Sequence, residues 1–153
     1  MNFLFSHINF YPLLIYFISL TPNTFVHSQP DKTSLFVNIK GLQSNEGKVL
    51  ILLFNNSSGF PEDDQKAYKS FELTIENKYA GDLFKEIPEG KYAISVLHDS
   101  DGDGEMKKNG IGHPAEPFGF SNDPSVFFGA PSFGKCSFEV KAGIDNTVTI
   151  NLK

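Results

Sequence analysis

The sequence has a single cysteine and no arginine. Because Cys136 is the only cysteine in 153 residues, no disulfide forms within one chain, and we expect packing alone to stabilise the fold. We interpret Cys136 as a small buried hydrophobe rather than a nucleophile. All thirteen basic residues are Lys, and the formal net charge is -5. Nucleic acid is usually bound by clustered Lys and Arg on a basic face, so we expect no nucleic-acid partner.

Charged residues are also missing from the start of the chain. Residues 1–28 contain no Asp, Glu, Lys or Arg, and the stretch from Phe10 to Leu20 is almost wholly apolar. This stretch is about half the ~20 residues that a spanning helix needs. We therefore predict a signal peptide over 1–28, cleaved before Gln29, and no stable membrane span after cleavage. Because the usual basic residue near the start is absent, an uncleaved anchor is the alternative.

The remaining residues, 29–153, have the length of one domain, and the chain is rich in apolar side chains, with sixteen Phe and five Tyr. Alternation of apolar and polar residues, or a short apolar run, predicts strands at 35–39, 49–54, 71–76, 82–87, 92–98, 136–141 and 147–152. Acids followed by lysines between Pro61 and Lys69 predict one short surface helix. We expect an all-β sandwich of about seven strands, with a long loop rich in Asp, Gly and Pro after the strand at 92–98.

That loop begins with three acids at alternate positions, Asp99, Asp101 and Asp103. Three like charges within five residues repel one another unless a cation neutralises them. Carboxylate oxygens are hard ligands that favour calcium over zinc or copper. Gly104 permits the sharp turn that brings such side chains together. We therefore predict a calcium-binding loop in the weak extracellular range of affinity, with a solvated acidic turn as the alternative.

The remaining ligands depart from the helix-loop-helix calcium motif. Counted from Asp99 as position one, Glu105 stands at seven, where a main-chain carbonyl serves as ligand. Gly110 stands at twelve, where the motif has a bidentate Glu, and Lys107 at nine brings a positive charge beside the ion. For calcium to bind, the Lys107 ammonium would have to point outward. We expect Glu116, further along the loop, to close the ligand shell if the loop folds back.

Four stretches resemble the DUF2141 family of bacterial proteins of unknown function. They are 87–99 (IPEGKYAISVLHD), the acidic loop, 110–122 (GIGHPAEPFGFSN) and 128–133 (FGAPSF). The resemblance implies an exported β-sandwich of immunoglobulin or transthyretin-like shape, in the periplasm of a Gram-negative bacterium or secreted, and it implies no known reaction. Members of the family usually carry an acidic residue where this chain has Lys107.

Five aromatic residues gather in and after the long loop: Phe118, Phe120, Phe127, Phe128 and Phe133. One interpretation is that these rings fasten the loop to the sandwich as a satellite core. The other is that they form an exposed platform for a carbohydrate or a protein partner. We expect an exported, non-catalytic module whose calcium-ordered loop, from Asp99 to Phe133, presents a binding surface.

Two alternatives belong to other classes of protein. A small metal-dependent hydrolase would use His98, His113 and neighbouring carboxylates, and it requires these groups to meet across a concave pocket. We favour a structural role for His98, with its ring bonded to a loop carbonyl or to Asp99. Ser121 follows Gly119 but lacks the second glycine of a nucleophile elbow. The second alternative is a purely structural envelope domain with no ligand.

Overall fold

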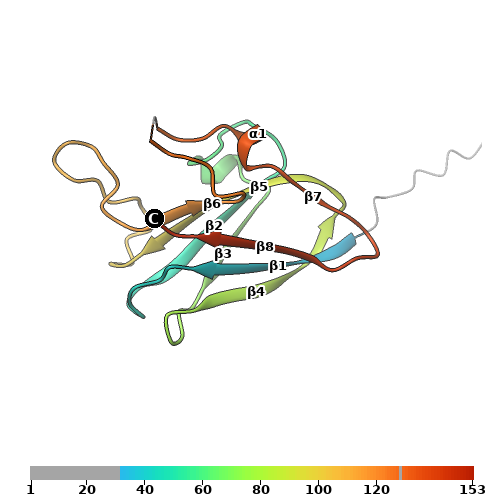
Figure 1. The fold of residues 1–153 in the computed structure, drawn as a ribbon, viewed down its shortest axis with the longest axis horizontal. Helices are drawn as coiled ribbons and strands as arrows, with labels where there is room; N and C mark the ends of the chain where they lie inside the picture. The colour runs from blue at the N-terminus through green and yellow to red at the C-terminus, as the bar shows by residue number, and fades with distance from the viewer. Residues whose placement is uncertain (1–31, 128) are drawn as a thin grey trace, which may run out of the picture.

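The computed structural model describes residues 32–127 and 129–153, which form two β-sheets (Figure 1). The predicted signal peptide over 1–28 and Phe128 lie outside the described residues. The strands are β1 (Lys32–Lys40), β2 (Lys48–Phe54), β3 (Lys69–Leu73), β4 (Ala80–Pro88), β5 (Gly90–Asp99), β6 (Phe118–Phe120), β7 (Phe138–Val140) and β8 (Asn146–Asn151). Within this part of the chain, no helix is both long and apolar enough to cross a membrane.

The smaller sheet has three strands in the order β4-β1-β8. Strand β1 pairs with β4 in antiparallel fashion and with β8 in parallel fashion. The two-residue period of β1 turns Leu35, Val37 and Ile39 to one face, where all three are fully buried. The predicted alternation of this strand is therefore confirmed.

The larger sheet has five strands, with β3-β2-β5-β6 in order and β7 beside the beginning of β5. All of its pairs are antiparallel. Strand β5 is the centre of this sheet, because β2 covers one of its edges while β6 and β7 share the other. Residues on both faces of β5 are buried, as is typical of a strand that is covered on two sides.

The main core lies between the two sheets. It joins apolar side chains of both, and its members are Leu35, Val37, Ile39, Leu42, Val49, Ile51, Leu53, Leu73, Ile75, Ala80, Phe84, Ile87, Tyr92, Ile94, Val96, Val140, Val148 and Ile150. Across it, the ring of Phe71 from one sheet stacks on Phe84 from the other, with centroids 3.6 Å apart. This arrangement confirms the prediction of an all-β sandwich.

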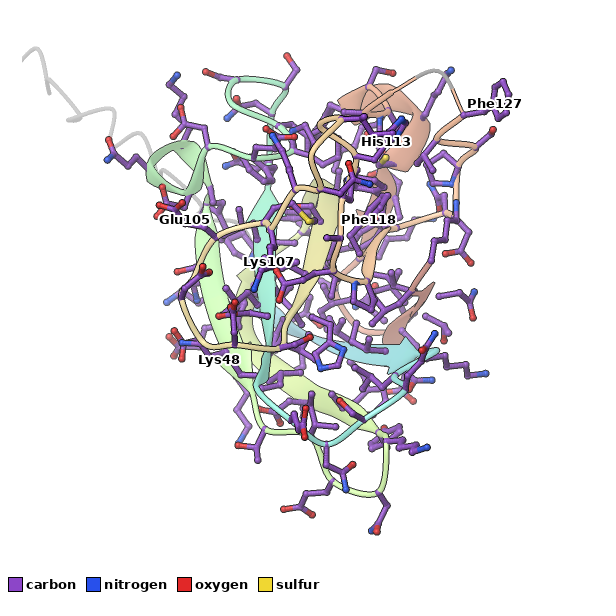
Figure 2. All side chains as sticks on the ribbon, turned by 90° about the vertical axis from the view of Figure 1, so that its left-hand side faces the viewer. Lys48, Glu105, Lys107, His113, Phe118 and Phe127 are labelled. Atoms are coloured by element: carbon purple, nitrogen blue, oxygen red, sulfur yellow. The ribbon has the colours of Figure 1, made fainter. Side chains whose placement is uncertain are left out.

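A second, aromatic cluster covers the other face of β5. Buried Ala93, Phe120 and Cys136 pack there with the partly buried residues Phe60, Phe118, Val126 and Phe133. The predicted satellite core is thus present for Phe118, Phe120 and Phe133. Phe127 does not belong to it: its side chain is 85% exposed and projects from the edge of the molecule (Figure 2).

The predicted short surface helix is present, as the three-residue 3-10 helix η1 (Asp64–Lys66). Three residues cannot bury an apolar face, and η1 has no buried residue. The four-residue helix α1 (Phe133–Cys136) instead takes the start of the strand predicted at 136–141, which is shortened to β7. Cys136 faces the aromatic cluster from α1.

The loop between β1 and β2 closes against the end of β5. Gly47 has a positive φ of 69°, and a Cβ atom built on it would lie 1.9 Å from the main-chain oxygen of Asp99. The backbones can approach this closely only because residue 47 has no side chain. The contact fixes the point at which β5 ends and the acidic loop begins.

We predict that Gly47→Ala lowers the unfolding free energy by more than the strain of placing Ala at a positive φ. Gly143→Ala is the matched control, because Gly143 has a similar φ of 74° but a Cβ atom added there would meet nothing within 4 Å. The control should cost about 1 to 2 kcal/mol of unfolding free energy. Gly47→Ala should cost clearly more, since the Asp99 carbonyl must also move. Equal losses in urea unfolding would contradict the close contact.

Cys136 is expected to resist thiol reagents in the folded protein. The residue is fully buried, and this burial raises the pKa of its thiol to about 11. At about pH 8 the thiol is therefore neutral, whereas the thiolate is the reactive form. Labelling with a disulfide reagent should be slow in buffer and rapid in denaturant. Fast labelling in buffer would show that α1 opens readily.

Candidate metal centre

The acidic loop is the first part of an excursion between two paired strands. Strand β5 ends at Asp99, and the chain returns at Pro117 to pair with β5 again as β6. The main-chain N–H of His98 donates to the Pro117 carbonyl at 2.8 Å, which closes the base of the excursion. Further out, the N–H of Ala115 donates to the Lys107 carbonyl at 2.7 Å. The excursion thus folds back on itself, which is the condition that the sequence set for Glu116 to approach the acids.

Asp99 is a fully buried carboxylate that organises the turn after β5. Its Oδ1 accepts the N–H of Gly102 at 2.8 Å and its Oδ2 accepts the N–H of Gly104 at 3.0 Å. Gly104 has a positive φ of 82°, as the sharp turn requires. Among the described residues, no ion pair involves Asp99. Two main-chain N–H groups are thus its hydrogen-bond partners among the described residues.

The three predicted aspartates come together. One carboxylate oxygen from each of Asp99, Asp101 and Asp103 lies within 4.8 Å of the others. Calcium binds oxygen at about 2.3 to 2.6 Å, so two ligands of one ion lie at most about 5 Å apart. The spacing therefore suits one hard cation. Asp99 is buried, whereas Asp101 and Asp103 are exposed.

The donor set fits calcium in its chemistry. Each oxygen of Asp99 accepts only one amide N–H, which leaves it a further lone pair. Asp103 uses Oδ1 for the N–H of Glu105 at 2.8 Å, and no described donor uses Oδ2. All of these atoms are oxygen, the ligand type that calcium prefers.

Glu116 fastens the two limbs of the loop. It is buried, and its Oε1 accepts the N–H of Ser100 at 2.8 Å, while its Oε2 accepts the N–H of Lys107 at 3.1 Å. It thereby joins residues 100 and 107, one on each side of the acidic turn. Glu116 is not in the three-aspartate group. Its role as a calcium ligand stays a prediction, and its two hydrogen bonds give it a separate structural role.

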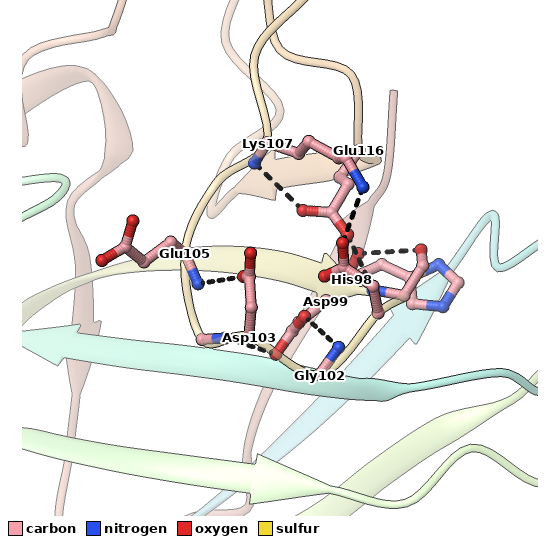
Figure 3. A network of polar contacts seen from close by, with 10 residues as sticks. His98, Asp99, Gly102, Asp103, Glu105, Lys107 and Glu116 are labelled. Atoms are coloured by element: carbon pink, nitrogen blue, oxygen red, sulfur yellow. Dashed lines mark hydrogen bonds and ion pairs between the residues drawn. The ribbon is translucent and has the colours of Figure 1, made fainter.

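Lys107 turns toward the acids instead of outward. Its Nζ lies 2.7 Å from Oδ2 of Asp101, and its side chain crosses that of Glu116 (Figure 3). The hydrogen bond from Lys107 and its charge lower the pKa of the Asp101 carboxyl. The same hydrogen bond and the charges of Asp101, Glu116 and Asp103 raise the pKa of Lys107. A cation of the chain itself is thus held at this loop.

Glu105 contributes its main chain rather than its carboxylate to the loop. Its N–H donates to Oδ1 of Asp103, while its exposed carboxylate points away from Asp99 and Asp103 (Figure 3). The role of Glu105 as a ligand through its main-chain carbonyl stays a prediction. Gly110 is exposed in the outer part of the excursion and offers no side-chain ligand.

The groups invoked for a hydrolase are not assembled. His98 is 2% exposed, and its Nε2 donates to the Glu46 carbonyl at 2.9 Å, so the predicted bond to a loop carbonyl is present. His113 is exposed at the outer end of the excursion (Figure 2). Among the described residues, the group of side chains close enough to share a metal ion contains the three aspartates and neither histidine. Ser121 is buried, and its hydroxyl donates to the Cys136 carbonyl at 2.6 Å.

Sequence reasoning missed the part of the site contributed by the loop between β1 and β2. The Glu46 carbonyl accepts the hydrogen bond from His98, and Gly47 lies against the main chain of Asp99. The signal available was the single residue Gly47 just before a strand. A glycine in that position predicts a turn but not the partner of the turn.

Fold and loop together define an all-β sandwich module with an acidic loop, in which three carboxylates converge, at the end of its central strand. A family model described as "Uncharacterized protein conserved in bacteria (DUF2141)" matches residues 37–149. Because the match covers more than half of the sequence, the chain belongs to the DUF2141 family, as its resemblance implied. No curated protein and no solved structure matches the chain.

Replacing Glu116 with Gln should loosen the loop. One amide oxygen can accept one N–H, but the new NH₂ group faces the other main-chain donor and leaves it unpaired. We expect a loss of about 1.5 to 3 kcal/mol in unfolding free energy, the range for hydrogen bonds to charged groups. Glu105→Gln removes the same charge from an exposed side chain and should be nearly neutral. Equal stability of the two variants in urea would contradict the fastening role of Glu116.

Proposed function

We propose that this protein is an exported, non-catalytic β-sandwich module whose acidic loop binds calcium and presents a binding surface. The observation that carries the proposal is the approach of the Asp99, Asp101 and Asp103 carboxylates to within 4.8 Å of one another. Like charges at this separation repel, and a divalent cation among them relieves the repulsion.

The burial of Asp99 supports a cation at this place. A carboxylate out of water is stable only when it is paired or hydrogen-bonded, and Asp99 has two amide donors and no ion pair among the described residues. Calcium at the loop would meet the remaining lone pairs. Because Asp101 and Asp103 are exposed, water and salt screen their attraction for the ion. We therefore place the affinity near the weak extracellular range, about 10⁻⁴ M or poorer.

The proposed binding surface lies on the segment from Asp99 to Phe133. Two large apolar side chains of this segment, Ile111 and Phe127, are 81% and 85% exposed. Apolar groups at such positions are a common feature of surfaces that bind a protein or a carbohydrate. Calcium would act by holding the first limb of this segment in one conformation.

Export is proposed from the sequence. The uncharged, apolar beginning of the chain is typical of a signal peptide, and the single cysteine requires no disulfide formation after export. The resulting location is the periplasm or the outside of a Gram-negative cell. Calcium at that side of the membrane is abundant enough for a weak site to be filled.

Calcium should raise the melting temperature of the mature protein. With about 10 mM calcium and a Kd near 10⁻⁴ M, mass action adds roughly 2.7 kcal/mol. For a domain of this size, that corresponds to a shift of about 5 to 10 °C in a thermal melt. Replacing both Asp101 and Asp103 with Ala should abolish the shift.

The control for this pair is Glu62→Ala with Glu89→Ala, which removes two exposed acids elsewhere. It should keep the full calcium response. Identical wild-type melts in calcium and in chelator would disprove the metal site. A response that persists in the Asp101 and Asp103 variant would place the ion at another group.

A further inference from the structure

The acidic loop already holds one positive charge, the ammonium of Lys107. Its Nζ lies 2.7 Å from Oδ2 of Asp101, the distance of a strong charge-assisted hydrogen bond. Asp101 is one of the three aspartates whose oxygens converge. The ammonium therefore already uses one oxygen of one of the three carboxylates that a metal ion would use.

Lys107 is held by its backbone as well as by its side chain. Its N–H donates to the buried carboxylate of Glu116 at 3.1 Å, and its carbonyl accepts the N–H of Ala115 at 2.7 Å. These bonds keep the root of the side chain next to the loop. A tethered amine competes with a free ligand at a high effective concentration.

The ammonium and a divalent ion at Asp101 would compete for the same negative charge. The ammonium already donates to Oδ2 at 2.7 Å, and a calcium ion would lie about 2.3 to 2.6 Å from the same carboxylate. Two positive charges so close repel each other strongly. The Lys107 side chain is 60% exposed, so it can swing into water while the backbone bonds to Glu116 and Ala115 stay in place.

We propose that Lys107 is a built-in competitor of calcium: its ammonium offsets the charge of Asp101 in the metal-free protein and must leave Asp101 for calcium to enter. The inference rests on the proposed calcium site and adds that Lys107 regulates calcium binding there. Two consequences follow. The loop stays folded without metal, and the affinity for calcium is lower than three converging aspartates would otherwise give.

The test compares Lys107→Gln with Lys108→Gln in calcium titrations by isothermal calorimetry. Gln keeps most of the length of the side chain and removes the charge. Lys108 is the matched control, because it is the next residue, is exposed, and carries the same charge. We expect Lys107→Gln to bind calcium roughly three- to tenfold more tightly than wild type. The substitution removes the exposed ion pair with Asp101 and the repulsion between the ammonium and the metal ion. Lys108→Gln should stay within about twofold of wild type, since screening weakens more distant charges.

The outcomes separate this inference from the proposed function. If wild type and Lys107→Gln bind with equal affinity, or the variant binds more weakly, the competition is disproved and the calcium site stands. If only Lys107→Gln binds, the competition is supported, but the natural chain is no calcium-binding module. If neither protein binds up to about 10 mM calcium, the weakest range known for extracellular sites is exceeded and both proposals fail.

Amine labelling gives a second readout in the wild-type chain. Reductive methylation followed by peptide mass spectrometry reports how freely each lysine reaches the reagent. Saturating calcium should increase the labelling rate of Lys107 and leave that of Lys108 unchanged. An unchanged or lower rate at Lys107 in a chain that binds calcium would show that the ammonium does not leave, and would overturn the inference.

Discussion

The structure of the acidic loop depends on one buried anion, the carboxylate of Asp99. Burying an unpaired carboxylate is costly, so its two oxygens must find partners, and they find them in the N–H groups of Gly102 and Gly104. This requirement bends the chain back immediately after β5 and sets Asp101 and Asp103 beside Asp99. The neighbouring loop is equally constrained, because Gly47 lies against the main chain of the same residue. The three acids thus converge because the Asp99 carboxylate accepts hydrogen bonds from the main chain that follows it.

Glu116 is a second buried carboxylate, at the other end of the loop. Its carboxylate is buried and accepts two main-chain N–H groups, from Ser100 and Lys107. Asp99 and Glu116 together hold the backbone of the loop without any metal ion, and a bound cation would stabilise this conformation further. The low affinity that we propose for calcium follows from the exposure of Asp101 and Asp103 and from the competing ammonium of Lys107, because a loop that is already folded would by itself favour binding. Lys107 is important in the metal-free loop because its ammonium offsets the charge of Asp101.

The strands and the position of the short surface helix could be predicted, whereas α1 could not. Leu35, Val37 and Ile39 alternate with polar residues, and a two-residue period has only one regular structure that buries its apolar set. Residues 61–69 carry charges in the order of a helix, yet they have no apolar stripe to bury, and only η1 forms there. The sequence pattern places Cys136 at the start of a strand. Packing of Cys136 against Ala93 and Phe120 decides its place in α1 instead.

By itself, the sequence determined the all-β architecture, the membership of the DUF2141 family and the three aspartates that meet after the central strand. These features are encoded within a few residues of one another, in periodicity, in spacing and in the glycines of a turn. Only the tertiary structure decided that Glu116 binds two amides, that Lys107 turns inward to Asp101, and that Phe127 stays outside the aromatic cluster. The physical reason is that several partners lie within reach of each of these side chains, and the return of the chain to β5 as β6 selects among them.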